Sequence, residues 1–309
     1  MKKIEKISRR WLRISLSKKK HFPVMCKEVV EYLDLKNKEW IVDCTLGLGS
    51  HSYHILKNSQ ARIIGIDKDK EALVLAKERL AEFENRVFLF YEDFKNLDKI
   101  LKTLGLEKID GAVFDLGASL YQFSSFERGF SFLREGPLDM RMDRESMPIS
   151  AYDLVNNLSE KELDYIFKEY GQEKAHRRIA RYIVEERKLY PIATTLRLAE
   201  IVVRASKAKS LRIHPATRVF QALRIVVNRE LDSLRETLKK VVNYLSEGGR
   251  ICVISFHSLE DKIVKDVFKV FHLEGILRKI TTQALKPSSW ELKLNPSSRS
   301  AKLRVAEKI

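Results

Sequence analysis

Cysteine is scarce in this chain, and its scarcity excludes two ways of stabilising a fold. The three cysteines, Cys26, Cys44 and Cys252, are widely spaced and form no CxxC pair. A disulfide framework and a zinc ribbon are therefore both excluded, and we expect a reducing compartment. The fold must rest on its apolar core, and 44% apolar residues in 309 are enough for one large domain and a second, smaller one.

Long apolar segments are also missing. No apolar run reaches about 18 residues, the length that a membrane-spanning helix needs. The first 20 residues, MKKIEKISRRWLRISLSKKK, lack the apolar stretch of a secretory signal. Their excess of lysine and the acidic Glu5 also differ from the composition of a transit peptide. We therefore expect no membrane association and a cytoplasmic location.

Acidic residues are too few to balance the basic ones. The chain has 58 Lys and Arg against 42 Asp and Glu, a net charge of +16. A heat-adapted surface raises both signs of charge, so it explains the 32% charged content but not the excess of one sign. The excess indicates a polyanionic partner, best fitted by nucleic acid. Residues 1–20 form a basic arm that either follows RNA phosphates or serves as a solubilising extension.

The segment from Trp40 to Asp67 has the order of a nucleotide-binding βαβ unit. An apolar run leads to a glycine turn at Gly47 and Gly49, and a second apolar run ends in Asp67, twenty residues after Gly47. Glycines let the backbone approach a ligand, the helix start offers N–H groups, and a carboxylate accepts bonds from ribose hydroxyls. Ser52 stands where the dinucleotide fingerprint has its third glycine, so an NAD site fits less well. An ordinary strand-to-helix turn is the alternative to a ligand site.

Strands and helices then alternate along the chain, with a helix expected at 70–83 and strands at 86–91 and 109–114. Alternation of this kind predicts a parallel, doubly wound sheet with ligands at the carboxyl ends of its strands. The residues that follow such strand ends are Gly49, Asp67, Phe94 and Asp115. Their shared position indicates a common site more strongly than the glycine turn alone.

The alternation stops after Asp115. A loop at 117–143 has no sustained period, but its aromatic and basic side chains argue against disorder. Ser159 and Glu162 then form a capping box, and three helices with one apolar face each follow. We predict a basic arm at 1–20, an α/β domain at 21–133 and 213–309, and an inserted all-helical domain at 134–212.

The pattern from His214 predicts one long helix, with Pro215 at its start and apolar positions continuing to Gly248. One side of this predicted helix carries a stripe of polar residues, a pattern typical of a face exposed to solvent. They are Arg218, Gln221, Arg224 and Asn228. Ser258 is the predicted cap of a later helix. The segment 284–300, rich in Pro and Ser, is expected to be a surface loop that reaches back toward the site.

Eight segments together resemble the bacterial 16S ribosomal RNA cytosine-N4 methyltransferase family, which uses S-adenosylmethionine. In chain order they are HFPV, DCTLGLGSHS, GIDKDKEAL, DLGAS, RGFSF with GPLDMRMD, HPATRVFQALRI, GGRICVISFHSLED and NPSSRSAKLRVAE. The resemblance covers residues 21–307. It implies a class I, Rossmann-like methyltransferase sheet with an inserted all-helical domain for substrate recognition.

The resemblance also implies the residues that hold the cofactor. The methionine part of the cofactor would be lined by Gly49, Ser50 and His51. Asp67 would bind the ribose hydroxyls, and Phe94 would pack on the adenine. Asp115 and Gln122 would lie where the methionyl end meets the target base. Two positions depart from the family, since Ser50 stands where it has glycine and Leu120 where it has serine. A neighbouring Ser119 remains.

Methyl transfer from a sulfonium needs alignment of the reacting atoms at about 3–3.5 Å rather than a metal. Neither His51 nor His257 has a second histidine at metal-ligand spacing, and a helix cap is the alternative for each. Cytosine N4 is a poor nucleophile because its lone pair is delocalised into the ring. Asp115-Leu116-Gly117 replaces the acidic or Asn, Pro-Pro, aromatic motif of many amino methyltransferases, so we assign no general base.

The target base must be unpaired or extruded, and aromatic side chains can then stack on it. The predicted substrate-binding residues are Ser119, Tyr121, Arg128, Phe130, Phe132 and Arg141, and packing between domains is the alternative for each aromatic. We expect small-subunit ribosomal RNA, within the assembled small subunit, as the partner, and a homodimer stays open. The competing functions are an NAD-dependent oxidoreductase, which Ser52 disfavours, and a non-catalytic RNA-binding assembly factor, which Leu120 keeps open.

Overall fold

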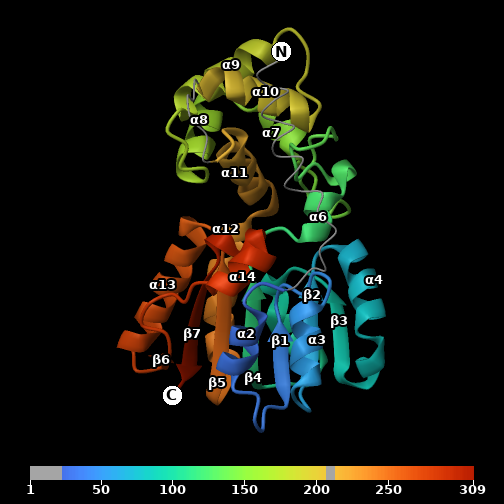
Figure 1. Cartoon of the computed structure of the whole chain (residues 1–309), viewed down its shortest axis with the longest axis vertical. Helices are drawn as coiled ribbons and strands as arrows, with labels where there is room; N and C mark the ends of the chain where they lie inside the picture. Colours follow the sequence, from blue (N-terminus) through green and yellow to red (C-terminus); the bar gives the residue numbers. More distant parts are fainter. Residues whose placement is uncertain (1–22, 207–212) are drawn as a thin grey trace. The chain divides into compact units, whose positions relative to one another are not determined.

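The computed structural model describes residues 23–206 and 213–309. This described chain forms two compact units, an α/β unit of residues 23–117 and 231–309 and a helical unit of residues 118–206 and 213–230 (Figure 1). The predicted basic arm lies outside the described residues, as do the first two residues of the HFPV segment. No helix among the described residues is long and apolar enough to cross a membrane.

A seven-stranded sheet in the order β3-β2-β1-β4-β5-β7-β6 forms the centre of the α/β unit. Its strands are β1 (Trp40–Asp43), β2 (Arg62–Asp67), β3 (Val87–Tyr91), β4 (Ile109–Asp115), β5 (Leu245–Ser255), β6 (Leu277–Lys279) and β7 (Lys302–Lys308). The first five pair in parallel, whereas β7 runs antiparallel to both β5 and β6. The predicted α/β sheet is confirmed.

Helices cover both faces of this sheet, as buried parallel strands require. One face carries α5 (Leu97–Thr103), α12 (Glu230–Tyr244) and α13 (Ser258–Leu273), and the other carries α2 (Cys26–Leu33), α3 (Ser50–Lys57) and α4 (Lys70–Arg79). Strand residues alternate between the two cores because successive side chains point to opposite faces. Ile41 packs in the second core and Val42 in the first.

The direction of winding reverses between β1 and β4. From β1 the chain winds outward through β2 and β3, and it then returns to β4 on the other side of β1. In open α/β sheets, ligands bind in the crevice at the carboxyl ends of the strands next to such a reversal. The loops that follow β1 and β4 are therefore where this fold positions a site.

The helical unit has a core of its own. Its helices are α6 (Leu120–Ser124), α7 (Ala151–Asn157), α8 (Glu160–Glu169), α9 (His176–Arg187), α10 (Thr195–Ser206) and α11 (Ala216–Asn228). Leu163, Phe167 and Ile183 are fully buried in this core. The predicted capping box is confirmed, because Ser159 Oγ accepts from the N–H of Glu162 and the Glu162 carboxylate accepts from the N–H of Ser159 at 2.7 Å.

The single long helix predicted from His214 to Gly248 is wrong. It is two helices, α11 and α12, because Arg229 between them has the left-handed φ of 50°. The apolar period continues through this break, so it could not reveal it. Arg224 and Glu230 form two hydrogen bonds of 2.9 Å across the break.

The polar arc of α11 is also not a solvated face. Asn228 is buried, donates to the carbonyl of Met140 at 2.7 Å, and accepts from the N–H of Met142 at 2.8 Å. Gln221 donates to the carbonyl of Tyr170 at 3.2 Å. These side chains anchor other segments of the helical unit to α11. A stripe of polar residues on a helix can therefore bind buried backbone groups instead of facing solvent.

Candidate functional site

The loop after β1 closes tightly against the end of β2. Gly47 and Gly49 have φ values of 50° and 72°, a left-handed conformation that glycine adopts without penalty. The N–H of Gly47 donates to Oδ2 of Asp67 at 2.7 Å, and α3 begins directly after Gly49. The glycine turn, the start of α3 and the Asp67 carboxylate therefore share one edge of the sheet.

Replacing Gly49 by alanine is expected to destabilise the protein by about 1–2 kcal/mol more than replacing Gly248. Both glycines have left-handed φ values, of 72° and 69°. A Cβ at Gly49 would lie 3.0 Å from Cδ1 of Leu80, whereas among the described residues nothing lies within 4 Å of a Cβ at Gly248. Urea unfolding of both variants measures the difference, and equal losses would contradict a close approach at Gly49.

Asp67 presents a fixed carboxylate at the end of β2. Besides the bond from Gly47, its Oδ1 accepts from the N–H of Asp69 at 2.8 Å. Burial raises the pKa of Asp67 to about 6, although the two backbone bonds oppose the rise. Each oxygen retains a second lone pair, so the carboxylate can accept from two neighbouring hydroxyls, as in a ribose.

His51 and Asp115 form a second, buried pair at this edge. His51 is only 5% exposed, and its Nε2 lies 3.4 Å from Oδ2 of Asp115. Burial lowers the pKa of His51, but Asp115 and Cys26 more than offset this effect and raise it to about 10. Among the described residues, neither ring nitrogen of His51 nor Oδ1 of Asp115 has a hydrogen-bond partner. The pair therefore offers both a donor and an acceptor to a zwitterionic ligand.

A network of hydrogen bonds supports Asp115 from β1. Its N–H donates to Oγ1 of Thr45 at 2.6 Å, and the buried Asp43 accepts from the hydroxyl of Ser52 at 2.7 Å. Burial raises the pKa of Asp43, and the bond from Ser52 opposes this. Ser52, which stands where the dinucleotide fingerprint has its third glycine, is therefore bonded to Asp43. Asp43 ends its strand as Asp67 and Asp115 do, a signal that could have identified it from the sequence.

Phe94 and Ser50 complete the predicted residues of this unit. Phe94 is half-buried after β3, with its ring centroid 5.9 Å from that of Phe114 and the two rings at 80°. The hydroxyl of Ser50 accepts a hydrogen bond from the Arg79 guanidinium, which ties α3 to α4. Ser50, in place of the family's glycine, therefore adds a hydrogen bond between α3 and α4.

Two residues that the sequence analysis missed lie near His51. Cys26 of α2 and Glu291 of α14 (Ser289–Leu294) both interact electrostatically with His51. The surface loop predicted at 284–300 is wrong in part, because it holds α14 and a short 3-10 helix, Pro296–Ser300. Glu291 Oε1 accepts from the N–H of Met25 at 2.8 Å, which fixes α14 on the start of α2. Burial raises the pKa of Glu291, and the bond from Met25 opposes this. No spacing rule connects these positions.

Gln122 and Ser119 belong to the helical unit, where they form the capping box of α6. Ser119 Oγ accepts from the N–H of Gln122 at 3.2 Å, and Gln122 Oε1 accepts from the N–H of Ser119 at 3.0 Å. Gln122 is buried, whereas Leu120 beside it is 41% exposed. The amide of Gln122 is therefore oriented by its own helix.

Most of the other predicted substrate residues of the helical unit make contacts within that unit, and Tyr121 among them is half-buried. Arg128 is buried and donates to the carbonyl of Met142 at 2.9 Å, and Arg141 holds Asp139 through bonds of 2.8 and 3.1 Å. The ring of Phe130 is buried against Phe123, and Phe132 stacks on His214 with centroids 4.5 Å apart. These geometries favour a supporting role for the two arginines and the two phenylalanines.

The predicted cap at Ser258 is wrong, because His257 caps α13. Its Nδ1 accepts from the N–H of Glu260 at 3.3 Å, while Glu260 Oε2 accepts from the N–H of His257 at 3.2 Å. Histidine is an uncommon cap, so the serine one residue later gave the stronger signal. The capping alternative for His257 is confirmed.

A sheet in this order, with an antiparallel strand beside the fifth, a glycine turn after the first and a carboxylate fixed at the end of the second, is the α/β fold of a class I methyltransferase. A family model described as the MraW methylase family matches residues 18–309. The chain belongs to this family, and the resemblance seen in the eight segments is confirmed.

Several relatives named "Ribosomal RNA small subunit methyltransferase H" align along nearly their whole length. Those of a Sulfurihydrogenibium species and of Thermotoga neapolitana are each 50% identical, over 94% of this chain and 99% and 96% of their own. One from Clostridium botulinum is 46% identical over 94% of this chain and 99% of its own. An rRNA methylase structure from Streptococcus thermophilus overlaps with a TM-score of 0.41 at 14% identity, covering 92% of this chain and 93% of its own.

Proposed function

We propose that the protein transfers a methyl group from S-adenosylmethionine to the exocyclic N4 of a cytosine in small-subunit ribosomal RNA. The observation that carries the proposal is the gathering of the Gly47 turn, Asp67, His51 and Asp115 at the reversal point of the sheet. The family and its named relatives support methyl transfer and the RNA class. The N4 position comes from the resemblance of the eight segments.

The residues of the α/β unit fit S-adenosylmethionine. Asp67 has acceptor capacity for the ribose diol, and the unsatisfied atoms of His51 and Asp115 match the α-carboxylate and α-ammonium of the methionine part. Phe94 provides a ring for the adenine, and Gly49 and Ser50 line the turn. Gln122, from the helical unit, stays a predicted cofactor ligand. When bound, the cofactor supplies a sulfonium methyl that a neutral amine can attack.

The chain's own contribution to the reaction is positioning. Thr45 fixes the backbone of Asp115, and His51 fixes its carboxylate, so an acceptor is held where an amine hydrogen can bond to it. Such a bond favours a pyramidal nitrogen and localises the lone pair that cytosine delocalises. Alignment of this kind is worth several orders of magnitude in rate. The proton can leave after transfer, so no general base is required.

The excess of basic residues suits an RNA substrate. We assign substrate recognition to the helical unit, where Ser119 and Tyr121 stay predicted contacts. We propose the assembled small ribosomal subunit as the form of the substrate and the cytoplasm as the location of the protein, and a homodimer is compatible with both. A non-catalytic assembly factor is the less favoured alternative, because relatives of 50% identity are named as methyltransferases.

The test is a methyl-transfer assay with purified small subunits and tritiated S-adenosylmethionine, followed by mass spectrometry of the RNA nucleosides. We expect label in N4-methylcytidine with the wild type and at least a 100-fold lower rate with Asp115→Ala. A wild type that binds the cofactor and transfers no label would instead favour the assembly factor. Label in another nucleoside would refute the N4 assignment.

Cofactor affinity is expected to fall by about 10-fold from pH 7 to pH 5. The pKa of Asp67 is about 6, and only the ionised carboxylate accepts from both ribose hydroxyls, so acidification through that pKa weakens binding. Calorimetry with S-adenosylhomocysteine at pH 5, 6, 7 and 8 measures the effect. Asp67→Asn should show weaker binding without this pH dependence, and a flat wild-type profile would contradict the assigned role.

A further inference from the structure

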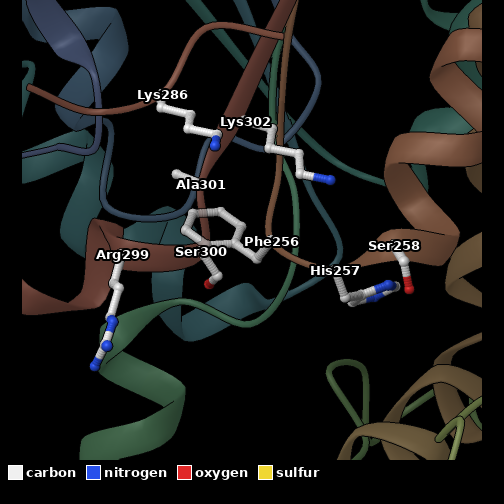
Figure 2. Close-up of a pocket in the computed structure, with 8 residues that line it drawn as sticks. All are labelled: Phe256, His257, Ser258, Lys286, Arg299, Ser300, Ala301 and Lys302. Atoms are coloured by element: carbon white, nitrogen blue, oxygen red, sulfur yellow. The ribbon is translucent and has the colours of Figure 1, made fainter.

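A basic pocket opens at the end of β5, in the α/β unit. Its volume is about 340 Å³, and its lining residues are Phe256, His257, Ser258, Lys286, Arg299, Ser300, Ala301 and Lys302 (Figure 2). Among the described residues, the lining includes three cationic side chains and two hydroxyl groups but no carboxylate. The function proposed above assigns no role to this pocket.

Two of the lining lysines come from segments that an isolated β-bridge joins. Leu285 and Leu303 form an antiparallel bridge in which each N–H donates to the other's carbonyl at 2.9 Å. In this register Lys286 lies opposite Lys302, on the same face. Like charges on neighbouring strands destabilise a ladder, and the bond from Lys302 to Asp261 at 2.9 Å offsets one of these two charges, which leaves that of Lys286 at the pocket.

The charges of the pocket are only partly neutralised. Lys302 and Arg304 both bond to Asp261 of α13, at 2.9 and 2.7 Å, so that carboxylate already has two cations. Burial would raise the pKa of Asp261, but these two partners hold it below its usual value. Lys286 and Arg299 form no ion pair with any carboxylate in the described part of the chain, and both are exposed.

The walls of the pocket are held in place. Ala301 and Ser298 are buried, and Ser298 Oγ donates to the carbonyl of Asn295 at 2.7 Å. His257 is fixed as the cap of α13, so the positive end of that 16-residue helix lies at the pocket. The walls of the pocket are therefore fixed, and the exposed Lys286 and Arg299 can reach an anion from its rim.

The pocket lies at the same sheet edge as Asp115. Asp115 at the end of β4 pairs with Ile254 of β5, and the next residue, Ser255, pairs with Lys302 of β7. Two strand spacings, roughly 10 Å, therefore separate Asp115 from Lys302. This separation suits a phosphate in the backbone that flanks a nucleotide whose base is at Asp115.

We propose that this pocket binds a backbone phosphate of the RNA substrate, next to the target nucleotide. Lys286 and Arg299 supply the charge, and the hydroxyls of Ser258 and Ser300 also line the pocket. The inference rests on the proposed RNA methylation and adds a contact that fixes the register of the strand. Phosphate contacts of this kind position a nucleic acid without reading its sequence.

The test compares Lys286→Gln/Arg299→Gln with Lys265→Gln/Lys269→Gln, which removes the same charge from exposed positions farther along α13. The probe is a radiolabelled transcript of small-subunit ribosomal RNA, bound on filters between 50 and 400 mM KCl. We expect the pocket variant to bind about 10-fold more weakly at low salt. The slope of log K against log salt should become shallower by roughly 0.7–0.9 for each phosphate that the variant no longer neutralises.

An affinity and slope equal to those of the control variant would overturn the proposal. So would a parallel loss of S-adenosylhomocysteine affinity, because the pocket would then belong to the cofactor site. A pocket variant with a lower affinity for inorganic phosphate and an unchanged affinity for the RNA transcript would refute the assignment to RNA. These are binding measurements, so failure of the wild type to methylate would count against the proposed function and not against the pocket.

Discussion

Replacing Asp67 by alanine is expected to weaken S-adenosylhomocysteine binding by about 100- to 10,000-fold. The carboxylate would make two charge-assisted hydrogen bonds to the ribose, and each is worth about 1.5–3 kcal/mol. The variant would also lose the bond that holds the glycine turn, since Gly47 donates to Asp67 at 2.7 Å. Calorimetry at pH 7.5 measures the change.

Asp69→Ala is the matched control for this experiment. Asp69 caps α4 by accepting from the N–H groups of Glu71 and Ala72, so its loss should lower stability by about 1 kcal/mol while leaving cofactor affinity nearly unchanged. If the two variants lost the same affinity, Asp67 would be acting through the fold of the loop and not through the ribose.

The free energy of unfolding is expected to fall by roughly 3–5 kcal/mol as the pH rises from 6.5 to 10. His51 has a pKa of about 10 in the folded chain, against 6.5 as an ordinary histidine. Its charged form is therefore favoured by folding, and this stabilisation is complete below pH 6.5 and disappears as the pH passes the folded pKa. Urea unfolding across this range measures the slope.

His51→Gln should remove this part of the pH dependence, and Asp115→Asn should lower the pKa of His51, because only Cys26 would then oppose the effect of burial. Proton and nitrogen NMR of the imidazole would follow that pKa directly. The assignment of His51 as a buried cation would fail if the wild type and His51→Gln had the same slope between pH 6.5 and 10.

The fold could be predicted from the sequence wherever the apolar residues followed the period of a single helix or strand. Ile63 to Ile66 reads as a buried strand and becomes one, and Asp67 ends it as expected. The division between α11 and α12 could not be predicted, because the apolar period is continuous through Arg229, whose φ is 50°, and because the bonds between Asn228 and Met140 and Met142 join residues far apart in the chain. Long-range polar contacts of this kind leave no periodic signal.

The candidate site could be predicted in part for a similar reason. Strand ends mark Asp67 and Asp115, because a parallel sheet collects such ends at one edge. Glu291 and Lys286 reach this edge on a segment whose path depends on the pairing of β7 with β5, which joins residues about fifty positions apart. Register across that distance is not readable from local spacing.

Thiol chemistry on this protein is confined to a single position. Burial raises the pKa of Cys44 and Cys252, so both thiols stay protonated and out of reach of alkylating reagents. Cys26 is half-buried at the start of α2, within the electrostatic reach of His51. A chain with three sulfhydryls therefore behaves as one with a single modifiable residue, beside the catalytic edge, where a fluorescent label can be attached without mutagenesis.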